Sequence, residues 1–310
     1  ELESPFLKET VLAHRQELSA DLMVSASGEA HQSGLPTIAF GVRGILMVDL
    51  ALYTATADMH SGHFGNFTPN AALEMVHLLG QLKDRDGKVK VPGFYDAVVP
   101  LTAEEQEAIA RVPAIEEMIK KQFGIQRTEQ PQSLQELVNQ PTFNIRGLQA
   151  GYVGEQASNI IPSTAHASLD IRLVDGMDPD TLYSSLVQYL QEKGYAVSET
   201  VPTAVQLCGS GPVLHMQRRG SFKAVKASMQ TGLPLQVLRV VGQSTSEPWV
   251  VEPTEGGSLN FEVFRELGIP LITLPVSNFD CNQHTHNENL RLDFFFRGIA
   301  IFKALLKFRT

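Results

Sequence analysis

The sequence has little cysteine, no excess of positive charge and no long apolar run. Its 310 residues include two cysteines, Cys208 and Cys281, which cannot build a disulfide framework and form no CxxC pair. The 34 acidic residues outnumber the 25 basic ones, and the net charge of −9 disfavours a nucleic-acid or anionic-membrane partner. No apolar run approaches the length of a bilayer span. We therefore predict a cytoplasmic protein without a membrane or nucleic-acid partner.

Several common catalytic signatures are also missing. The sequence contains no GxSxG elbow, no P-loop, no HExxH helix and no Rossmann glycine fingerprint. Cys281 stands three residues before His284, but nothing else around either cysteine suggests a nucleophile. These absences disfavour a serine hydrolase of the α/β type, a P-loop nucleotide hydrolase and a cysteine hydrolase.

The composition does allow a substantial core, since 43% of the residues are hydrophobic and only 19% are charged. Expected elements alternate between strands and helices at both ends of the chain and become α+β in the middle. We predict an α/β domain with a mostly parallel central sheet, interrupted by a smaller α+β domain. Residues 1–47 and 205–310 would form the first domain, and residues 48–204 the second.

Periodicity and turn signals define the expected elements. Strands are expected at 20–27, 35–58, 143–152, 165–174, 235–241 and 269–276, and helices at 69–84, 104–112, 114–124, 179–194, 221–230, 260–268 and 290–308. The strands at 143–152 and 165–174 alternate apolar and polar residues, which is typical of half-buried antiparallel strands.

The densest polar cluster is NFDCNQHTHNENL, residues 278–290, between an apolar strand and the last helix. Loops after the carboxyl ends of parallel strands are where open α/β sheets bind ligands. His284 and His286 are two residues apart, so in an extended loop they point in opposite directions and at most one should bind a metal. The alternative is that both are surface histidines before a helix.

Three further positions are ambiguous from the residues alone. His60 ends a long strand in ADMHSGHFGN and is either structural or catalytic. Arg172, on an alternating strand, either binds a carboxylate through its guanidinium fork or makes a surface ion pair. Gly257 is the second glycine of the pair Gly256-Gly257, and Ser258 follows it. This segment runs toward a helix and is either an anion-binding turn, with Ser258 as a possible N-cap, or an ordinary helix start.

The order of the motifs resembles the M20 family of metallopeptidases, in its dipeptidase and carboxypeptidase branch. The resemblance covers essentially the whole chain. It rests on ELES, ADLMVSAS, PTIAFGVRG, ADMHSGHFGN, DGKVKVPGFYD, SNIIPSTAHASLDIRL, EGGS and HTHNENL, in this order.

The resemblance implies a catalytic α/β domain interrupted by an α+β lid that forms a homodimer. It also implies a pair of metal ions, usually zinc with manganese as an alternative, that activate a water against a small peptide or amino-acid amide. The expected reaction is hydrolysis of dipeptides or C-terminal peptide bonds. The alternatives are an N-acyl amino acid amidohydrolase and a catalytically silent dimerising relative.

Site residues follow from the same resemblance. Glu1 and His284 match metal ligands. His60 matches the lid histidine that polarises the scissile carbonyl, which dimeric relatives supply from the neighbouring subunit. The remaining matches are substrate-binding positions, with Asn159 and Arg172 at the substrate backbone and carboxylate and Gly257 and Ser258 in a loop of the same pocket.

Two departures from the family pattern bear on activity. Ser27 stands where relatives place an Asp or Glu ligand, and a neutral hydroxyl is a poor zinc ligand. The chain also begins at about the second Glu of the family's Glu pair, so the general base and further ligands would lie upstream. We therefore expect the chain alone to bind metal weakly and to have little activity.

Overall fold

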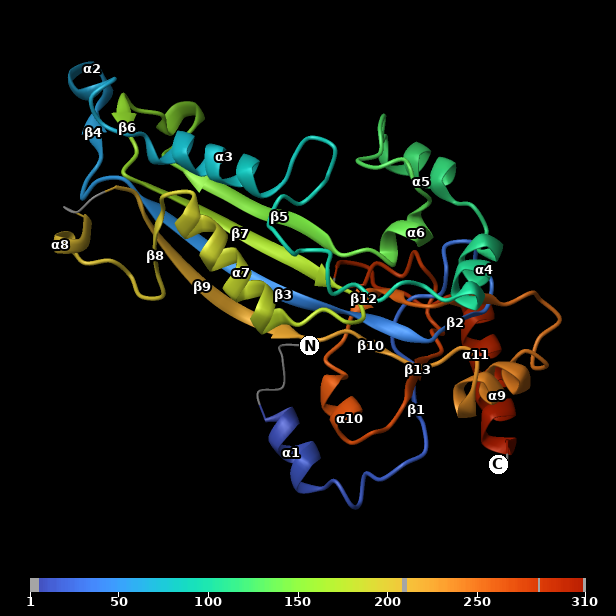
Figure 1. Cartoon of the computed structure of the whole chain (residues 1–310). Coiled ribbons are helices and arrows are strands. Elements are labelled where there is room, and N and C mark those ends of the chain that lie inside the picture. Colours follow the sequence, from blue (N-terminus) through green and yellow to red (C-terminus); the bar gives the residue numbers. More distant parts are fainter. Residues whose placement is uncertain (1–5, 208–210, 284, 309–310) are drawn as a thin grey trace. The chain divides into compact units, whose positions relative to one another are not determined.

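The structure is a computed structural model that describes residues 6–207, 211–283 and 285–308 (Figure 1). The chain divides into two compact units. Unit 1 consists of Glu1–Gly44, Val99–Gln140 and Lys223–Thr310, and unit 2 of Ile45–Val98 and Pro141–Phe222. The predicted α/β fold with an inserted α+β part is confirmed. No helix among the described residues is long and apolar enough to cross a bilayer.

Apart from residues 45–47, which belong to unit 2, the unit boundaries differ from the three predicted segments in two places. Residues 99–140 were expected in the inserted domain but belong to unit 1, and residues 205–222 belong to unit 2. The first difference has a physical cause in a buried ion pair, because Glu105 contacts Lys226 of unit 1 at 2.7 Å. The second arises because the strand at 213–222 pairs along its whole length with the strand at 45–53.

Unit 1 is built on a four-stranded sheet of order β1-β13-β2-β11. Its strands are β1 (Met23–Ser25), β13 (Leu271–Thr273), β2 (Thr37–Ala39) and β11 (Val250–Glu252). The β1–β13 and β2–β11 pairs are parallel, and the β13–β2 pair is antiparallel. Ile38 and Ile272 are fully buried in the core beside these strands.

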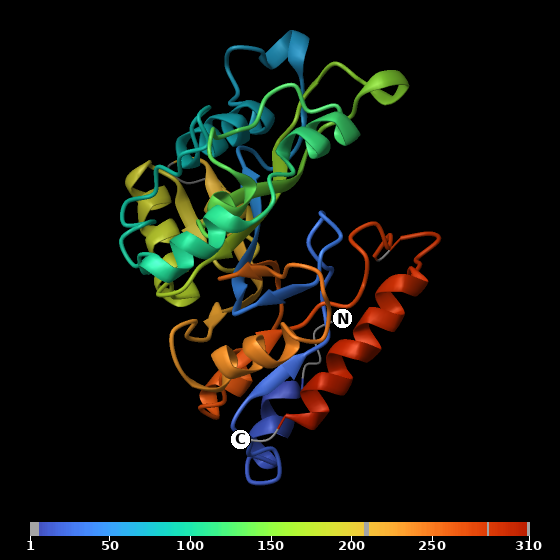
Figure 2. The same cartoon turned by 90° about the vertical axis from the view of Figure 1, so that its right-hand side faces the viewer.

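Two helices cover this core. The helix α11 (Leu292–Lys307), the long red helix in Figure 2, packs against α9 (Gly232–Val241). Val237 and Val241 of α9 and Ile301 of α11 are buried in the same apolar cluster. The unit also contains α1 (Leu7–Ala13), α4 (Ala103–Arg111), α5 (Glu116–Phe123), α6 (Leu134–Val138), β10 (Val225–Lys226), β12 (Glu255–Ser258) and α10 (Glu262–Glu266).

Two element predictions in this unit were wrong. Residues 235–241, predicted as a strand, form most of α9, because burial of Val237 and Val241 at a spacing of four residues outweighs the strand propensity of three valines. Residues 221–230, predicted as a helix, contain the end of one strand and β10. The backbone of Val225 and Lys226 pairs there with Val42 and Gly41.

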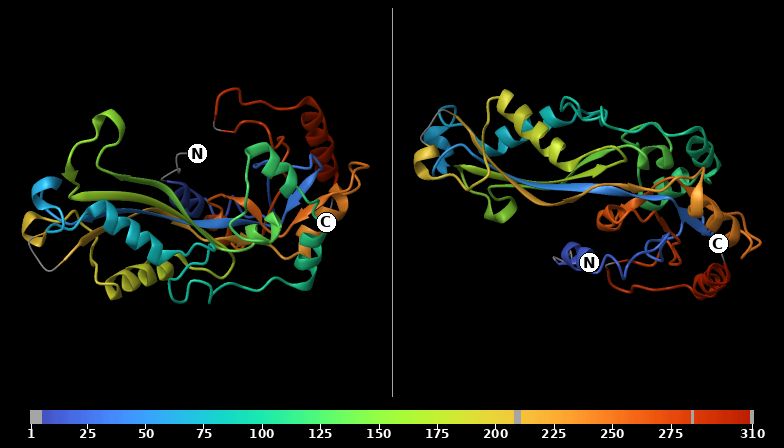
Figure 3. Two further views of the ribbon diagram at one scale, coloured as in Figure 1. Left: turned by 90° about the horizontal axis from the view of Figure 1, so that it is seen from above. Right: turned by 60° about the horizontal axis from the view of Figure 1, so that its bottom comes forward.

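Unit 2 contains a long, mostly antiparallel sheet whose central strands come from distant parts of the chain. The strands β5 (Thr142–Ala150), β7 (Thr164–Leu173), β3 (Gly41–Tyr53), β9 (Val213–Phe222) and β8 (Ala196–Ser198) lie in this order, and the β8–β9 pair is parallel. The helices α3 (Ala71–Leu82) and α7 (Pro179–Glu192) lie on the same side of the strands in both views of Figure 3. The predicted strands at 143–152 and 165–174 and helices at 69–84 and 179–194 are confirmed.

The two faces of this sheet differ in chemistry. The face toward the helices carries buried apolar side chains, among them Leu50, Leu52, Leu169, Leu214 and Met216. Alternate residues of the same strands, which point the other way, are polar and more exposed. The remaining elements of the unit are β4 (Met59–His60), α2 (Ser61–Phe64), the 3₁₀ helix Gly154–Gln156, β6 (Ile160–Ile161) and α8 (Ala204–Leu207).

Candidate active-site residues

The two predicted metal ligands, Glu1 and His284, lie outside the described residues. Ser27, at the predicted ligand position, is exposed, and its backbone N–H donates to Ser25 Oγ at 3.2 Å. No group of three or more His, Cys, Asp or Glu side chains in the described part of the chain is arranged to hold a metal ion. The described residues therefore contain no metal centre with three or more such ligands.

The half-buried carboxyl group of Glu255 lies beside Gly28 in unit 1. Gly28 has a φ of +94°, and a Cβ there would stand 2.3 Å from Glu255 Oε1. Thr273 Oγ1 donates to Glu255 Oε2 at 3.0 Å. Burial raises the pKa of Glu255 to about 7. The hydrogen bond from Thr273 lowers this pKa, and the charge of Glu29 raises it further. The backbone thus approaches a carboxyl group as only glycine allows.

Glu252, three residues earlier on β11, is 7% exposed. Gln135 Nε2 of α6 donates to its Oε1 at 2.5 Å. Burial, together with the charge of Glu255, raises the pKa of Glu252 to about 8. Sequence reasoning missed both glutamates, because EPTE before a glycine pair is typical of an ordinary loop. Nothing in the local sequence indicates that these carboxyl groups are shielded from solvent.

The polar loop after β13 is ordered by hydrogen bonds within unit 1. Asn278 is fully buried, donates to Asp280 Oδ1 at 2.7 Å and accepts from the Arg291 backbone N–H at 2.9 Å. Cys281 donates to Glu29 Oε1 at 3.4 Å, and burial raises the pKa of its thiol. A hollow of about 360 Å³ is lined here by Ser277, Cys281, Gln283, Glu288, Asn289 and Leu290. His286, the second predicted candidate, is exposed.

Gly257 and Ser258 belong to the strand β12, and not to a helix start. The cap residue of the next helix, α10, is Phe261. Ser258 Oγ donates to the Gly44 carbonyl at 3.2 Å. Arg43 fixes the same strand, because its Nε and Nη2 both donate to the Gly256 carbonyl, at 2.9 and 2.6 Å. The alternative of a Ser258 helix cap is therefore wrong.

His60 ends β4 and forms the N-cap of α2. Its Nδ1 accepts the Gly62 backbone N–H at 3.0 Å, and its ring lies 4.7 Å from the ring of His63. Since Nδ1 is an acceptor, the neutral imidazole carries its proton on Nε2. The side chain is exposed, so this N–H is available to an external oxygen.

The predicted substrate residues of unit 2 fall into two places. Asn159 is exposed beside His60, because its carbonyl accepts the Ser61 N–H at 2.9 Å and Ile160 pairs with His60. Arg172 lies near the other end of β7, where its Nε is 3.6 Å from Asp170 Oδ1. With a rise of about 3.3 Å per residue, the strand separates Arg172 from the His60 end by roughly 30 Å.

Comparison with known proteins supplies a family. A family model described as a peptidase dimerisation domain matches residues 40–197. A Cys-Gly metallodipeptidase, DUG1, of Candida albicans is 24% identical over 85% of this chain and 53% of its own length. A Beta-Ala-His dipeptidase of Rattus norvegicus is 24% identical over 87% of this chain and 53% of its own length. The chain thus spans about half the length of these curated relatives.

Solved structures agree in fold. An M20 family metallo-carboxypeptidase, Sso-CP2, of Sulfolobus solfataricus superimposes with a TM-score of 0.82 at 26% identity, covering 97% of this chain and 66% of that chain. Human carnosine dipeptidase 1 superimposes with a TM-score of 0.76 at 21% identity, covering 97% of this chain and 62% of that chain. Both units of the chain therefore have counterparts in solved peptidases.

Proposed function

The chain belongs to the M20 peptidase family, and from this we propose that it is part of a metal-dependent peptidase that hydrolyses dipeptides or C-terminal peptide bonds. The observation that carries the proposal is the agreement in fold with a metallo-carboxypeptidase over 97% of the chain. The names of the curated relatives, which are metallodipeptidases and Beta-Ala-His dipeptidases, support a small peptide as substrate.

His60 would stabilise the scissile carbonyl. Its Nδ1 is held by the Gly62 N–H, which fixes the ring and leaves Nε2–H as a donor toward an oxygen that gains negative charge in the reaction. A donor that is oriented before substrate binds loses little reorganisation energy during the reaction. Asn159 would bind the substrate backbone next to the same carbonyl, and its contact with the Ser61 N–H, beside His60, supports this.

Arg172 would bind the substrate carboxylate with its guanidinium group. Because the sheet holds Arg172 roughly 30 Å from His60 within one chain, the two residues can serve one substrate only if they come from different copies. This separation supports a homodimer through unit 2, which includes most of the residues matched by the dimerisation-domain model. Gly257 and Ser258, in unit 1, stay predicted substrate-binding residues.

The metal is proposed to be zinc, two ions per site, with manganese as the alternative and with Glu1 and His284 as ligands. Such ions activate water and polarise the carbonyl when bound. The described residues do not complete the ligand set of these ions. The cytoplasmic location stays a prediction.

The test is hydrolysis of a dipeptide panel by the protein as its gene encodes it, before and after chelation. We expect activity to be lost on chelation and restored by zinc or manganese. His60→Ala should lower kcat by roughly 100-fold or more, as loss of one oxyanion donor does. His77→Ala, at an exposed position of α3, is the matched control and should leave activity unchanged. Activity indifferent to the chelator would refute the proposal.

The same panel distinguishes an amidohydrolase, which would prefer N-acyl amino acids over free dipeptides. A second candidate, a silent dimerising relative, is favoured by the exposed Ser27 hydroxyl at a ligand position. For that candidate we expect no stoichiometric metal in the natural protein and new metal binding in Ser27→Asp. Stoichiometric zinc with an unchanged Ser27 would exclude it.

A further inference from the structure

The face of the unit 2 sheet opposite its helices carries two histidines in one row. In the β3–β9 register Ala51 pairs with His215, and Asp49 pairs with Gln217. On the other side of β3, Ser168 Oγ of β7 donates to Asp49 Oδ1 at 2.7 Å, and the Thr54 N–H donates to the Ser163 carbonyl. These contacts place His166 directly beside Ala51. The row therefore reads His166, Ala51, His215 across β7, β3 and β9.

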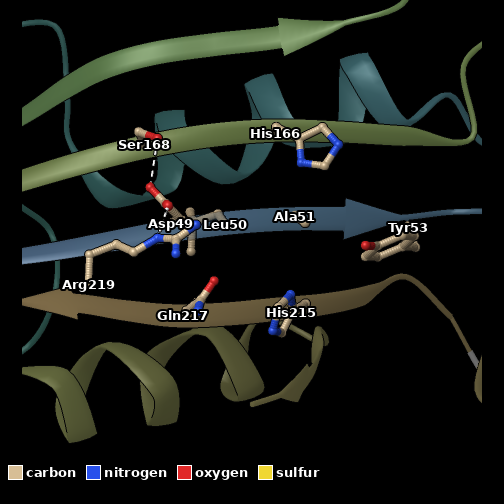
Figure 4. Close-up of a pocket in the computed structure, with 9 residues that line it drawn as sticks. All are labelled: Asp49, Leu50, Ala51, Tyr53, His166, Ser168, His215, Gln217 and Arg219. Atoms are coloured by element: carbon tan, nitrogen blue, oxygen red, sulfur yellow. Dashed lines mark hydrogen bonds and ion pairs between the residues drawn. The ribbon is translucent and has the colours of Figure 1, made fainter. Parts of the chain in front are cut away.

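A polar hollow lies over this row (Figure 4). Its volume is about 250 Å³, and its lining residues are Asp49, Leu50, Ala51, Tyr53, His166, Ser168, His215, Gln217 and Arg219. The small side chain of Ala51 forms the floor between the two imidazole rings. The neighbours Leu50, Leu52, Leu214 and Met216 point to the opposite face and are buried, so the strand alternation fixes both histidines on this one.

The two imidazoles are available to a ligand. His166 is exposed and His215 is half-buried. Neither side chain makes a hydrogen bond or ion pair with another described residue, and the same holds for Gln217. In contrast, the carboxylate of Asp49 is already bound by Ser168 and Arg219. The uncommitted polar side-chain groups in the hollow are therefore imidazole nitrogens, a neutral carboxamide and the Tyr53 hydroxyl.

We propose that His166 and His215 together bind one divalent transition-metal ion above Ala51. Imidazole is the commonest protein ligand for zinc and suits copper and nickel equally. Two inter-strand spacings separate the two Cα atoms by about 9.5 Å. Two imidazoles that lean over an alanine can both reach one ion at a nitrogen–zinc distance of about 2.0 Å.

This site is independent of the proposed catalytic centre, whose ligands belong to unit 1. It offers two protein ligands, and water fills the other positions, with Gln217 close enough along β9 to hydrogen-bond such a water. With two protein ligands in place of the four of a structural zinc site, its affinity is modest and its ion exchangeable. The ion would link β7 to β9 across β3 and brace the centre of the sheet.

The probe is zinc alone, titrated calorimetrically into the full chain and into variants with unaltered circular dichroism. We expect one of the binding events to weaken by at least about 10-fold in both His166→Ala and His215→Ala, since even the loss of an outer-shell partner has that effect. His77→Ala, on the exposed face of α3 across the sheet, is the matched control and should keep the event.

A third variant tests the position of the ion without touching a ligand. Ala51→Leu fills the floor of the hollow and should weaken the same binding event. Cobalt gives an independent readout, since the imidazole resonances of His166 and His215 should broaden together and before those of His77. Equal zinc affinity in all variants, weakening in only one histidine variant, or undiminished binding in Ala51→Leu would each overturn the proposal.

Discussion

Two glutamates with raised pKa values, Glu252 and Glu255, make the stability of unit 1 depend on pH. Glu252 is buried on β11 and Glu255 follows on β12, with pKa values raised to about 8 and about 7. An ordinary glutamate titrates near pH 4.3. Both groups therefore hold protons in the folded protein at pH values where the unfolded chain has lost them.

For Glu252 the sign of the effect follows from linkage. Between about pH 4.5 and pH 8 the folded state binds more protons than the unfolded state, so the free energy of unfolding falls as the pH rises. The Glu252→Gln variant lacks this titration and can still bond to Gln135. We expect its stability to fall less between pH 5 and pH 8, by roughly a few kcal/mol, when measured by urea unfolding.

Thr273→Val is a matched comparison, because it removes a hydrogen bond to Glu255 without removing a titrating group. It should lower stability while keeping the fall with pH. Parallel stability profiles for the natural protein and Glu252→Gln would show that Glu252 is ionised in the folded state after all.

Among the helices, α4 is attached to unit 1 by a buried charge pair. Its capping box joins Thr102 and Glu105, so the same glutamate closes the helix start and contacts Lys226 at 2.7 Å. Their side chains are only 6% and 12% exposed. A buried charge without its ion-pair partner strongly destabilises the folded state.

We therefore expect Lys226→Met to destabilise unit 1 by about 3–5 kcal/mol, because it leaves Glu105 buried and unpaired. The double variant Lys226→Met with Glu105→Gln should recover much of this loss, since no unpaired charge remains. Thermal unfolding of the two variants measures the difference. A double variant that is less stable than the single one would contradict this account.

The elements also show which features of the fold can be read from a sequence. Alternation predicted β5 and β7, and the spacing of apolar residues predicted α3 and α7. The helix α9 was predicted as a strand, because valine propensity and helical spacing point in opposite directions and only the packing partner decides. The attachment of residues 99–140 to unit 1 involves the ion pair of Glu105 with Lys226, which are 121 residues apart in the sequence. Local reasoning therefore assigned this segment to the wrong unit.

For the candidate site, the motifs supplied His60 and Asn159, and the structure shows that they lie beside each other. Their roles stay predictions. The motifs did not reveal the long separation of Arg172, which follows from the length of β7. They also missed the two glutamates with raised pKa values, Glu252 and Glu255, and the row of His166 and His215. Those features depend on burial and on the register between strands, and a local sequence pattern predicts neither.

At the scale of the whole molecule, the distance between His60 and Arg172 bears on assembly. We expect the protein to be a dimer at micromolar concentration in sedimentation equilibrium. Mixing an inactive His60→Ala variant with an inactive Arg172→Met variant should restore part of the activity, because mixed dimers contain one intact site. A monomer with full activity would contradict the shared site.

The path of the chain has a practical consequence for anyone who wishes to study unit 2 in isolation. The polypeptide passes between the units four times, at residues 44, 98, 140 and 222, so unit 2 is made of two stretches with an excursion between them. Trimming both ends of the gene would leave residues 99–140 dangling, with Glu105 deprived of Lys226. A recombinant unit 2 instead requires a splice that replaces this excursion with a short linker from Val98 to Pro141.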